Sequence, residues 1–320
     1  MARPSVLVTC RVPASVLDYL STHVDVDLND NPEGLDPAAF RQRAQGRQGL
    51  VIVLRDRVDA EFLAAVPGLR VVGNIAVGYD NIDVAAARAR GIVVTNTPDV
   101  LTGATADLTI AILLDLTRRV SEGDRLIRRG GWTGWALDFM LGTELRGRLL
   151  GIVGYGRIGR AVAARARAFG MRIAYADRNG APAASEDGAL RMPLDELLAS
   201  ADVVSIHVPL SPETRGLIGE RELGLMRKSA YLLNTARGPV VDETALARAL
   251  RDGTIAGAAL DVFEREPHVP AALLGLENVV LVPHLGSATV ETRTAMADLA
   301  ARNVVAVLTG QPPLTPVTLS

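Results

Sequence analysis

The chain has 320 residues, a length that favours two domains over one hydrophobic core, and its net charge is only −2. Because no long basic run is present, we expect neither a nucleic-acid nor a membrane-surface partner. A single cysteine, Cys10, excludes an intrachain disulfide and any multi-cysteine metal site, and no metal is expected. The first residues, MARPSVLVTC, lack the apolar stretch of a signal peptide, and no apolar run reaches the ~20 residues that span a bilayer. We therefore expect a cytoplasmic protein.

The amino-terminal third alternates short runs of β-branched residues with helical patterns. The expected strands are Ser5–Val8, Val24–Leu28, Leu50–Leu54, Leu69–Asn74 and Ile92–Asn96. The expected helices are Pro13–Thr22, Ala60–Ala65 and Asp83–Arg90. This alternation predicts a parallel sheet with helices on both faces.

A longer helical pattern follows, in which apolar residues recur every three or four positions. It predicts one helix over Thr105–Arg129, which ends where Gly130, Gly131 and Gly134 break the repeat. A second alternating series then predicts the strands Leu150–Val153, Arg172–Ala176, Val203–Val208, Tyr231–Asn234, Ala258–Val262 and Val279–Val282. Six strands separated by helices match a complete dinucleotide-binding domain. Thr289–Thr309 is expected to form a final helix.

A glycine-rich turn joins the first strand of this second series to a helical run. Its glycines, Gly154, Gly156 and Gly159, have the spacing that permits a tight turn, close approach of a pyrophosphate and close helix–sheet packing. Arg157 and Ile158 lie within the turn, where the helix N-terminus presents free N–H groups to a phosphate.

The next strand ends at Asp177, 18 residues after Gly159, near the spacing of the acid that binds the adenosine ribose. The alternative is a glycine-rich turn followed by a surface aspartate, but strand, turn, helix and acid together favour NAD(H) over NADP(H). Arg178 beside this acid weakens the expected discrimination against a 2′-phosphate.

Arg237, Glu266 and His284 each come shortly after an expected strand, so they are expected at the carboxyl edge of the sheet, where ligands bind. An arginine suits a carboxylate, a histidine exchanges protons near neutral pH, and a glutamate beside it favours the imidazolium. Taken singly, each residue also fits a plainer role as a solvated charge, part of an exposed acidic loop or a structural histidine. His207 also ends a strand, and the pattern alone does not rank it below His284.

The chain resembles the D-isomer-specific 2-hydroxyacid dehydrogenases over nearly its whole length. The motifs that carry the resemblance are Asn74-Ile75-Ala76-Val77-Gly78-Tyr79-Asp80-Asn81-Ile82-Asp83, Val94-Thr95-Asn96-Thr97-Pro98-Asp99-Val100-Leu101-Thr102, Thr105-Ala106-Asp107, the glycine turn, His207-Val208-Pro209-Leu210, Asn234-Thr235-Ala236-Arg237-Gly238, Asp261-Val262-Phe263-Glu264-Arg265-Glu266-Pro267 and Pro283-His284. The resemblance implies an α/β fold of two doubly wound parallel-sheet domains. A Rossmann nucleotide-binding domain over residues 100–287 is inserted into a flavodoxin-like substrate domain made of residues 1–99 and 288–320.

The resemblance also implies roles for individual residues. Arg237, Glu266 and His284 become the catalytic trio, and the backbone amides of Val77 and Gly78 bind the substrate carboxylate together with Arg237. Asp261 is implied to contact the nicotinamide amide and Pro209 to wall the cofactor pocket. The further implied cofactor contacts are Thr105, His207, Thr235, Ala236, Arg237, His284 and Gly286.

The branch that the chain resembles most is that of glyoxylate and hydroxypyruvate reductases, which transfer hydride between NAD(H) and a small 2-keto or D-2-hydroxy acid. Leu54 and, by the same resemblance, the segment around Trp135–Leu141 supply bulky apolar side chains near the substrate, which favours a short second substituent. The alternatives are another enzyme of the family, such as a phosphoglycerate or phosphite dehydrogenase, and an NADH-sensing corepressor-like binding protein. Phosphite-oxidising relatives carry a lysine where this chain has Val77.

Two further expectations concern the surface. Arg55 stands where related sequences often carry a small or neutral residue, so it either adds a cation for anionic substrates or points to solvent. The helix over Thr105–Arg129 exposes more apolar surface than one domain face covers, and relatives commonly dimerise here, so we expect a symmetric homodimer. Trp132 or Trp135 is expected at that interface or near the neighbouring subunit's cleft.

Overall fold

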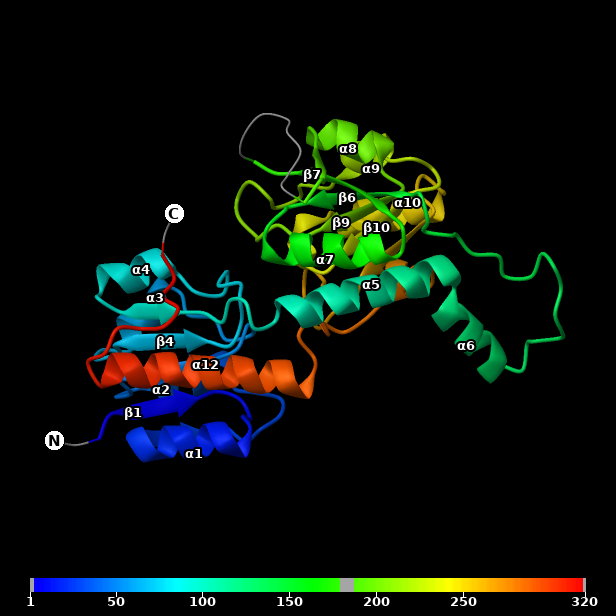
Figure 1. The fold of residues 1–320 in the computed structure, drawn as a ribbon. Helices are drawn as coiled ribbons and strands as arrows, with labels where there is room; N and C mark the ends of the chain where they lie inside the picture. Colours follow the sequence, from blue (N-terminus) through cyan, green and yellow to red (C-terminus); the bar gives the residue numbers. More distant parts are fainter. Residues whose placement is uncertain (1–2, 179–186, 319–320) are drawn as a thin grey trace. The chain divides into compact units, whose positions relative to one another are not determined.

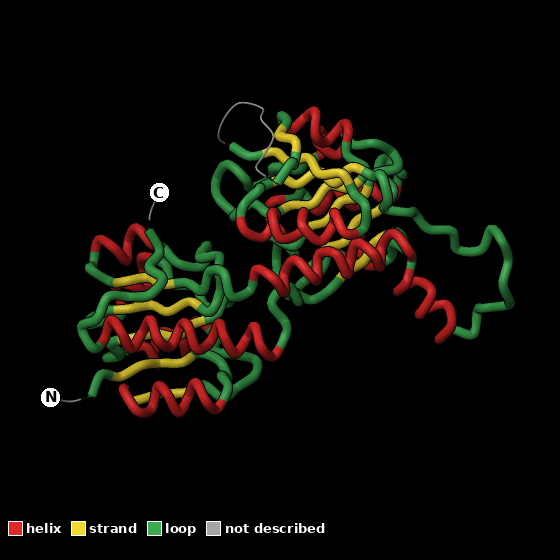
Figure 2. Tube along the Cα trace, in the orientation of Figure 1, coloured by secondary structure: helices red, strands yellow, loops and turns green. Residues whose placement is uncertain are grey.

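The computed structural model describes residues 3–178 and 187–318 of the chain. The chain divides into two compact units: a first unit made of Met1–Leu101 and Ala288–Ser320, and a second unit made of Thr102–Ser287. Each unit is built on a parallel sheet with helices on both faces, so the predicted fold class is confirmed (Figure 2).

The first unit has, within its described residues, a five-stranded sheet in the order β2-β1-β3-β4-β5. Its strands are β1 (Ser5–Val8), β2 (Asp25–Leu28), β3 (Gly49–Ile52), β4 (Val71–Asn74) and β5 (Val93–Thr95). Its helices are α1 (Ala14–His23), α2 (Pro37–Ala44), α3 (Ala60–Ala65), α4 (Val84–Ala89) and α12 (Val290–Leu308). The sequence pattern did not predict α2, which begins where the Asp36 carboxylate accepts hydrogen bonds from two backbone amides of its first turn.

The residues of each strand alternate between the two faces of this sheet. In β1, Val6 and Val8 pack with α1 and α12, whereas Leu7 packs with Phe40 of α2 and Phe62 of α3. Because both faces are covered, every residue of β3 and β4 is buried, as expected of a parallel sheet. Helix α12 lies along β4, so a helix from the carboxyl-terminal part of the chain covers the sheet built by the amino-terminal part (Figure 1).

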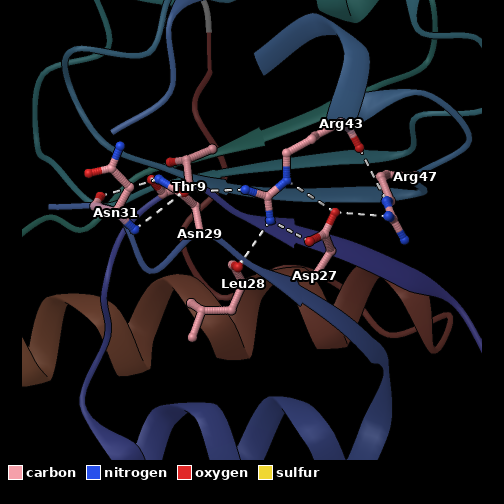
Figure 3. A network of polar contacts seen from close by, with 7 residues as sticks. All are labelled: Thr9, Asp27, Leu28, Asn29, Asn31, Arg43 and Arg47. Atoms are coloured by element: carbon pink, nitrogen blue, oxygen red, sulfur yellow. Dashed lines mark hydrogen bonds and ion pairs between the residues drawn. The ribbon is translucent and has the colours of Figure 1, made fainter. Parts of the chain in front are cut away.

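Strand β2 forms an edge of this sheet and is fastened to α2 by charged groups (Figure 3). The Asp27 carboxylate lies between the guanidinium groups of Arg43 and Arg47. Arg43 also donates to Asn29 Oδ1 at 3.2 Å, and Asn29 Nδ2 donates to the Thr9 carbonyl at 3.1 Å. The network thus ties an edge strand with few apolar residues to the loop that follows β1.

The second unit has, among its described residues, a seven-stranded sheet in the order β12-β11-β10-β9-β6-β7-β8. Its strands are β6 (Leu149–Val153), β7 (Arg172–Ala176), β8 (Leu190–Arg191), β9 (Val203–Ile206), β10 (Tyr231–Asn234), β11 (Gly257–Leu260) and β12 (Val279–Leu281). Its helices are α5 (Thr102–Arg118), α6 (Val120–Arg128), α7 (Arg157–Ala168), α8 (Leu194–Ser200), α9 (Glu220–Leu225), the 3₁₀ turn η1 (Gly238–Val240), α10 (Glu243–Arg251) and α11 (Ala271–Leu274). Helices α5 and α7 cover one face, and α8 to α11 cover the other.

Two details of the second unit differ from the expectation. The short strand β8 adds a seventh strand to the predicted six, and its two residues are too few to show a sequence period. The predicted single helix over Thr105–Arg129 is two helices, because Arg119 adopts a left-handed backbone with φ 55°. The Asp115 carboxylate accepts from the Ser121 amide at 2.6 Å and so satisfies the start of α6. None of the described helices has the length and apolarity needed to cross a bilayer.

A close helix–sheet contact in the first unit leads to a stability prediction. A Cβ atom at Gly73 would lie 2.7 Å from Val304 Cγ2 and 3.1 Å from the Ala300 carbonyl oxygen of α12. We therefore expect Gly73→Ala to lower the free energy of unfolding by about 1–3 kcal/mol, measured by urea denaturation. The matched control is Gly224→Ala in α9, where the added methyl meets no atom of the described chain within 4 Å. That variant should be neutral or slightly more stable, because alanine favours helix, and equal losses in both variants would contradict the packing argument.

Candidate active site

The glycine turn joins β6 to α7 and has the shape of a phosphate cradle. Gly154 has φ +94°, and a Cβ there would lie 2.8 Å from the His207 backbone. A Cβ at Gly159 would lie 2.4 Å from the Gly154 carbonyl oxygen, so this glycine lets α7 begin against the turn. Both positions require glycine for reasons of the chain's own packing.

Gly156 differs from its two neighbours, because a Cβ there would meet nothing within 4 Å in the described part of the chain. It is the N-cap of α7, with Arg157 and Ile158 in the first turn. A small residue facing open space at a helix N-terminus fits the close approach of a phosphate to free N–H groups. The residues of the turn therefore fit a dinucleotide pyrophosphate.

Asp177 lies directly after β7, the neighbour of β6 in the sheet, and its side chain is exposed. Its Oδ1 accepts from the Arg178 amide at 2.7 Å, and Arg191 donates to its carbonyl at 2.7 Å. The carboxylate is thus held at the strand end next to the glycine turn, where the sequence spacing predicted a ribose-binding acid.

The segments that carry Arg237, Glu266 and His284 follow β10, β11 and β12, which are adjacent and parallel. The structure therefore brings all three to the same edge of the second unit's sheet. Ahead of Arg237, the Asn234 side chain donates to the Arg237 carbonyl at 2.9 Å and accepts from the Ala236 amide at 3.0 Å. Asn234 shapes the turn that carries the arginine, a role that the sequence analysis did not assign.

Glu266 and His284 form a hydrogen-bonded pair. Glu266 Oε2 lies 2.8 Å from His284 Nδ1, and Glu266 Oε1 accepts from the Phe263 amide at 3.1 Å. Burial raises the pKa of Glu266, but the hydrogen bond from His284, that ring's charge, the Phe263 amide and the Arg237 charge outweigh it, and the pKa lies below its usual range. An ionised Glu266 accepts a hydrogen bond from the N–H group at Nδ1, so Nε2 is the ring atom left for proton exchange.

The His284 backbone is in the left-handed region, with φ 53°, which is costly for a residue with a side chain. Asp261 holds it there. The Asp261 carbonyl accepts from the His284 amide at 2.9 Å, and its carboxylate accepts from the Leu285 amide at 2.5 Å and the Gly286 amide at 2.8 Å. Burial raises the pKa of Asp261, although these amides and the His284 charge oppose the effect.

A second buried carboxylate supports the loop that carries Glu266. Glu243, at the start of α10, accepts from the Glu264 amide at 2.6 Å. Burial raises the pKa of Glu243, and the charges of Glu264 and Glu266 add to the rise. A Cβ at Gly238 would lie 1.9 Å from the Phe263 carbonyl carbon, so this glycine lets the Arg237 turn touch the same loop. The sequence pattern does not reveal Glu243, because an acid at the start of a helix has the same pattern whether its side chain is buried or exposed.

The structure distinguishes His207 from His284. His207 follows β9, and its Nε2 lies 2.8 Å from the hydroxyl of buried Ser205. Burial lowers the pKa of the His207 imidazole to about 3, so the ring stays neutral in the working range of most enzymes. Its backbone abuts Gly154, which places it beside the glycine turn rather than in an acid–base pair.

The other cofactor candidates of the second unit lie either at helix α5 or in the loops that follow β9 and β10. Thr105 of α5 lies near Gly286, where an added Cβ would be 3.5 Å from its hydroxyl, and Thr235 Oγ1 lies 3.0 Å from the hydroxyl of Thr109 on the same helix. Pro209 is exposed after β9, and its carbonyl accepts from Thr214 at 2.6 Å. Ala236 lies in the Arg237 turn, and its carbonyl accepts from the Arg237 guanidinium at 2.8 Å.

The predicted substrate-binding residues Leu54, Val77 and Gly78 belong to the first unit, in the loops after β3 and β4. The Val77 carbonyl accepts from Asn96 Nδ2 and the Gly78 carbonyl from Asn74 Nδ2, each at 2.8 Å. Within residues 3–178 and 187–318, the Val77 and Gly78 amides have no backbone or side-chain acceptor. They are therefore available to an anion.

Arg55, which follows Leu54, makes a contact that the sequence did not predict. Its Nη1 donates to the Pro32 carbonyl at 3.3 Å, and a Cβ at Gly34 would lie 2.3 Å from its guanidinium carbon. The cation thus lies against the loop that follows β2.

Comparison with known proteins agrees with this geometry. Residues 110–286 match the family model described as D-isomer specific 2-hydroxyacid dehydrogenase, NAD binding domain. The glyoxylate reductase of Thermococcus onnurineus is 46% identical over 318 residues, which cover 98% of this chain and 95% of that protein.

Solved structures are also similar over nearly the whole chain. A crystal structure of a protein from Thermus thermophilus superposes with a TM-score of 0.92 at 46% identity, covering 98% of this chain and all of that one. The NADPH-dependent glyoxylate/hydroxypyruvate reductase of Sinorhizobium meliloti, solved with NADP and malonate, has a TM-score of 0.89 at 38% identity and covers 99% of this chain and 97% of its own. With its phosphate-cradle turn and its paired glutamate and histidine, the chain belongs to the D-isomer-specific 2-hydroxyacid dehydrogenase family.

Proposed function

We propose that this enzyme reduces glyoxylate to glycolate and hydroxypyruvate to D-glycerate. The observation that carries the proposal is the pair of Glu266 and His284, 2.8 Å apart at the carboxyl edge of the nucleotide-binding sheet. Relatives at 46% identity named glyoxylate reductase support the choice of substrate.

The residues of the second unit divide the work. The glycine turn, with Gly154, Gly156 and Gly159, takes the pyrophosphate of the dinucleotide, and Asp177 takes the adenosine ribose. The bound nicotinamide supplies the hydride that reduces the substrate's carbonyl carbon. Its ring end is proposed to lie near Asp261. The further cofactor contacts proposed are Thr105, Arg157, Ile158, His207, Pro209, Thr235, Ala236, Arg237, His284 and Gly286.

His284 and Arg237 act on the substrate's oxygen atoms. His284 Nε2 donates a proton to the carbonyl oxygen as negative charge develops there, while Glu266 stabilises the imidazolium from Nδ1. The Arg237 guanidinium polarises that carbonyl and pairs with the carboxylate, a task for which its planar fork suits it better than a lysine.

The substrate carboxylate also needs neutral donors, which we assign to the amides of Val77 and Gly78. Leu54 limits the second substituent, because its bulk leaves little room for a branched group and its apolar surface disfavours a charged one. Selectivity of this kind is worth about 1–3 kcal/mol per methylene, so small keto acids are preferred but larger ones are still used.

The function is tested by catalytic efficiency with NADH across glyoxylate, hydroxypyruvate, pyruvate and 2-ketoisocaproate, with phosphite in the oxidative direction. Glyoxylate and hydroxypyruvate should be used best. His284→Ala, the inactive control, should lose about 10²–10⁴-fold in turnover, because it lacks the general acid. Better use of phosphite or 2-ketoisocaproate would reject the branch assignment. Absence of steady NADH consumption with every keto acid would favour the corepressor-like alternative.

The pH dependence of reduction tests the pairing of Glu266 with His284. An ionised carboxylate 2.8 Å from Nδ1 favours the protonated imidazole. In Glu266→Gln this attraction is gone, so the proton is lost earlier as pH rises. We expect the falling limb of the kcat/KM profile for reduction to move to lower pH while some activity remains. Glu264→Gln, which changes an exposed neighbour on the same loop, is the matched control, and an unmoved limb in Glu266→Gln would show that Glu266 does not act through the histidine.

We also propose that NADH is preferred over NADPH. The Asp177 carboxylate accepts from ribose hydroxyls, and a 2′-phosphate there would meet like charge and lose those bonds. Arg178 next to it reduces the discrimination, and one relative of similar fold is NADPH-dependent.

The ratio of kcat/KM with the two cofactors tests this preference. It should favour NADH in the unmodified enzyme and shrink in Asp177→Ser, which keeps a small polar residue without the charge. Asp195→Ser, which removes another exposed acid of the same unit, should leave the ratio unchanged. Equal efficiency with both cofactors before any substitution would contradict the assignment.

A homodimer is the further part of the proposal. Helix α6 has no buried residue, and the segment after it leaves large apolar side chains open, with Trp135 80% and Leu137 83% exposed. Several exposed large apolar side chains in one short segment are typical of an interface, and a twofold dimer is the commonest closed assembly. Trp132 and Trp135 are proposed to lie at this interface.

Light scattering at micromolar concentration should give the mass of two chains. Leu137→Asp should shift the mass toward one chain, because it places a charge on apolar surface that the proposed dimer buries. Leu274→Asp, on another exposed leucine of the second unit, is the control and should leave the mass unchanged. A single-chain mass for the unmodified protein would overturn the dimer.

A further inference from the structure

The carboxyl-terminal segment after α12 returns to the end of β5 and pairs with it. Pro316 forms an antiparallel bridge with Thr95, and the Val317 amide donates to the Val94 carbonyl at 2.8 Å. The Asn96 amide donates to the Thr315 carbonyl at 3.3 Å. The last part of the described chain thus lies beside the residues that leave β5.

Thr315 is held on its other side by α12. Asn303, which is fully buried, donates to Thr315 Oγ1 at 2.8 Å and accepts from the Thr315 amide at 2.9 Å. The Thr315 hydroxyl then donates to the Asn96 carbonyl at 2.6 Å. A continuous path of hydrogen bonds therefore runs from the α12 side chain Asn303 through Thr315 to Asn96.

The path continues into the loop after β4. Asn96 Nδ2 donates to the Val77 carbonyl, and the Thr97 amide donates to the Ala76 carbonyl, both at 2.8 Å. In a planar trans peptide, the C=O and the N–H point in opposite directions. A partner on the Ala76 carbonyl therefore aims the Val77 N–H away from residues 96–97, and a partner on the Val77 carbonyl aims the Gly78 N–H the same way.

We propose that Asn303, Thr315 and Asn96 form a positioning relay through which the carboxyl-terminal segment orients the Val77 and Gly78 amides. The inference rests on the proposed role of these amides in binding the substrate carboxylate. Donors held in place before the substrate arrives need no reorganisation on binding. The relay thus gives a polar, buried asparagine of α12 a function in substrate affinity, although the relay itself touches no substrate.

The test removes one hydroxyl. Thr315→Val keeps the shape of the side chain but neither donates to Asn96 nor accepts from Asn303, whereas Thr315→Ser keeps the hydroxyl. Thr309→Val is the matched control, because among the described residues the hydroxyl of this C-cap residue donates to the Val305 and Ala306 carbonyls of α12. The KM for glyoxylate should rise about 3- to 10-fold in Thr315→Val, while kcat and the Kd for NADH change less than about twofold. Thr315→Ser and Thr309→Val should behave like the unmodified enzyme.

Asn96→Asp tests the next link, because a carboxylate repels the Val77 carbonyl instead of donating to it. Its KM should rise at least as much, and the double variant with Thr315→Val should be little worse than Asn96→Asp alone, because both act on one path. An unchanged KM in Thr315→Val, or fully additive effects in the double variant, would overturn the relay.

Hydrogen exchange separates the relay from the proposed function. The Asn96 and Thr97 amides should exchange faster in Thr315→Val than in Thr315→Ser, in the absence of any substrate. If the unmodified enzyme reduces no keto acid, the proposed function fails, and the exchange rate of the Thr97 amide, which bonds the Ala76 carbonyl, alone decides the relay. Equal exchange in the two variants then rejects it.

Discussion

The pairing of Glu266 with His284 depends on two buried carboxylates that bind backbone amides behind it. Asp261 accepts from the Leu285 and Gly286 amides and so holds the left-handed backbone of His284. Glu243 accepts from the Glu264 amide and so fixes the loop that carries Glu266. An amide–carboxylate bond is stronger than a neutral one, which suits the task of offsetting a strained conformation.

In the first unit, the loop after β4 is held through its carbonyl groups instead of its amides. There, the Thr97 amide donates to the Ala76 carbonyl and the Asn96 side chain donates to the Val77 carbonyl, and the N–H groups of the same two peptides, at Val77 and Gly78, stay available. Holding a carbonyl leaves the N–H of the same peptide for a ligand, whereas holding an N–H, as Asp261 does, uses the donor up. The arrangement in the first unit therefore leaves donors for an anion, whereas the arrangement in the second unit orients an imidazole.

The departures from the expected elements have local physical causes. Arg119 interrupts the predicted long helix because the Asp115 carboxylate satisfies the Ser121 amide and so starts α6. An apolar repeat passes through such a break unchanged, since it reports which face is apolar and not which backbone angle a single residue adopts. His207 and His284 look alike in the strand-end pattern, yet one contacts Ser205 and the other Glu266, a difference of partners rather than of sequence position.

The sequence by itself determined the parallel-sheet class, most of the strands and the glycine turn, because strand period and turn glycines are local signals. It also identified Arg237, Glu266 and His284 as residues beyond strand ends and predicted a glutamate beside the histidine, whereas the 2.8 Å contact between Glu266 and His284 comes from the structure. Tertiary structure alone decided the contacts of Glu243, Asn303, Thr315 and Asn96, whose partners lie 12 to 219 residues away in the sequence. A hydrogen bond between such distant residues leaves no periodic trace, since it depends on how loops and helices converge at the edge of a sheet.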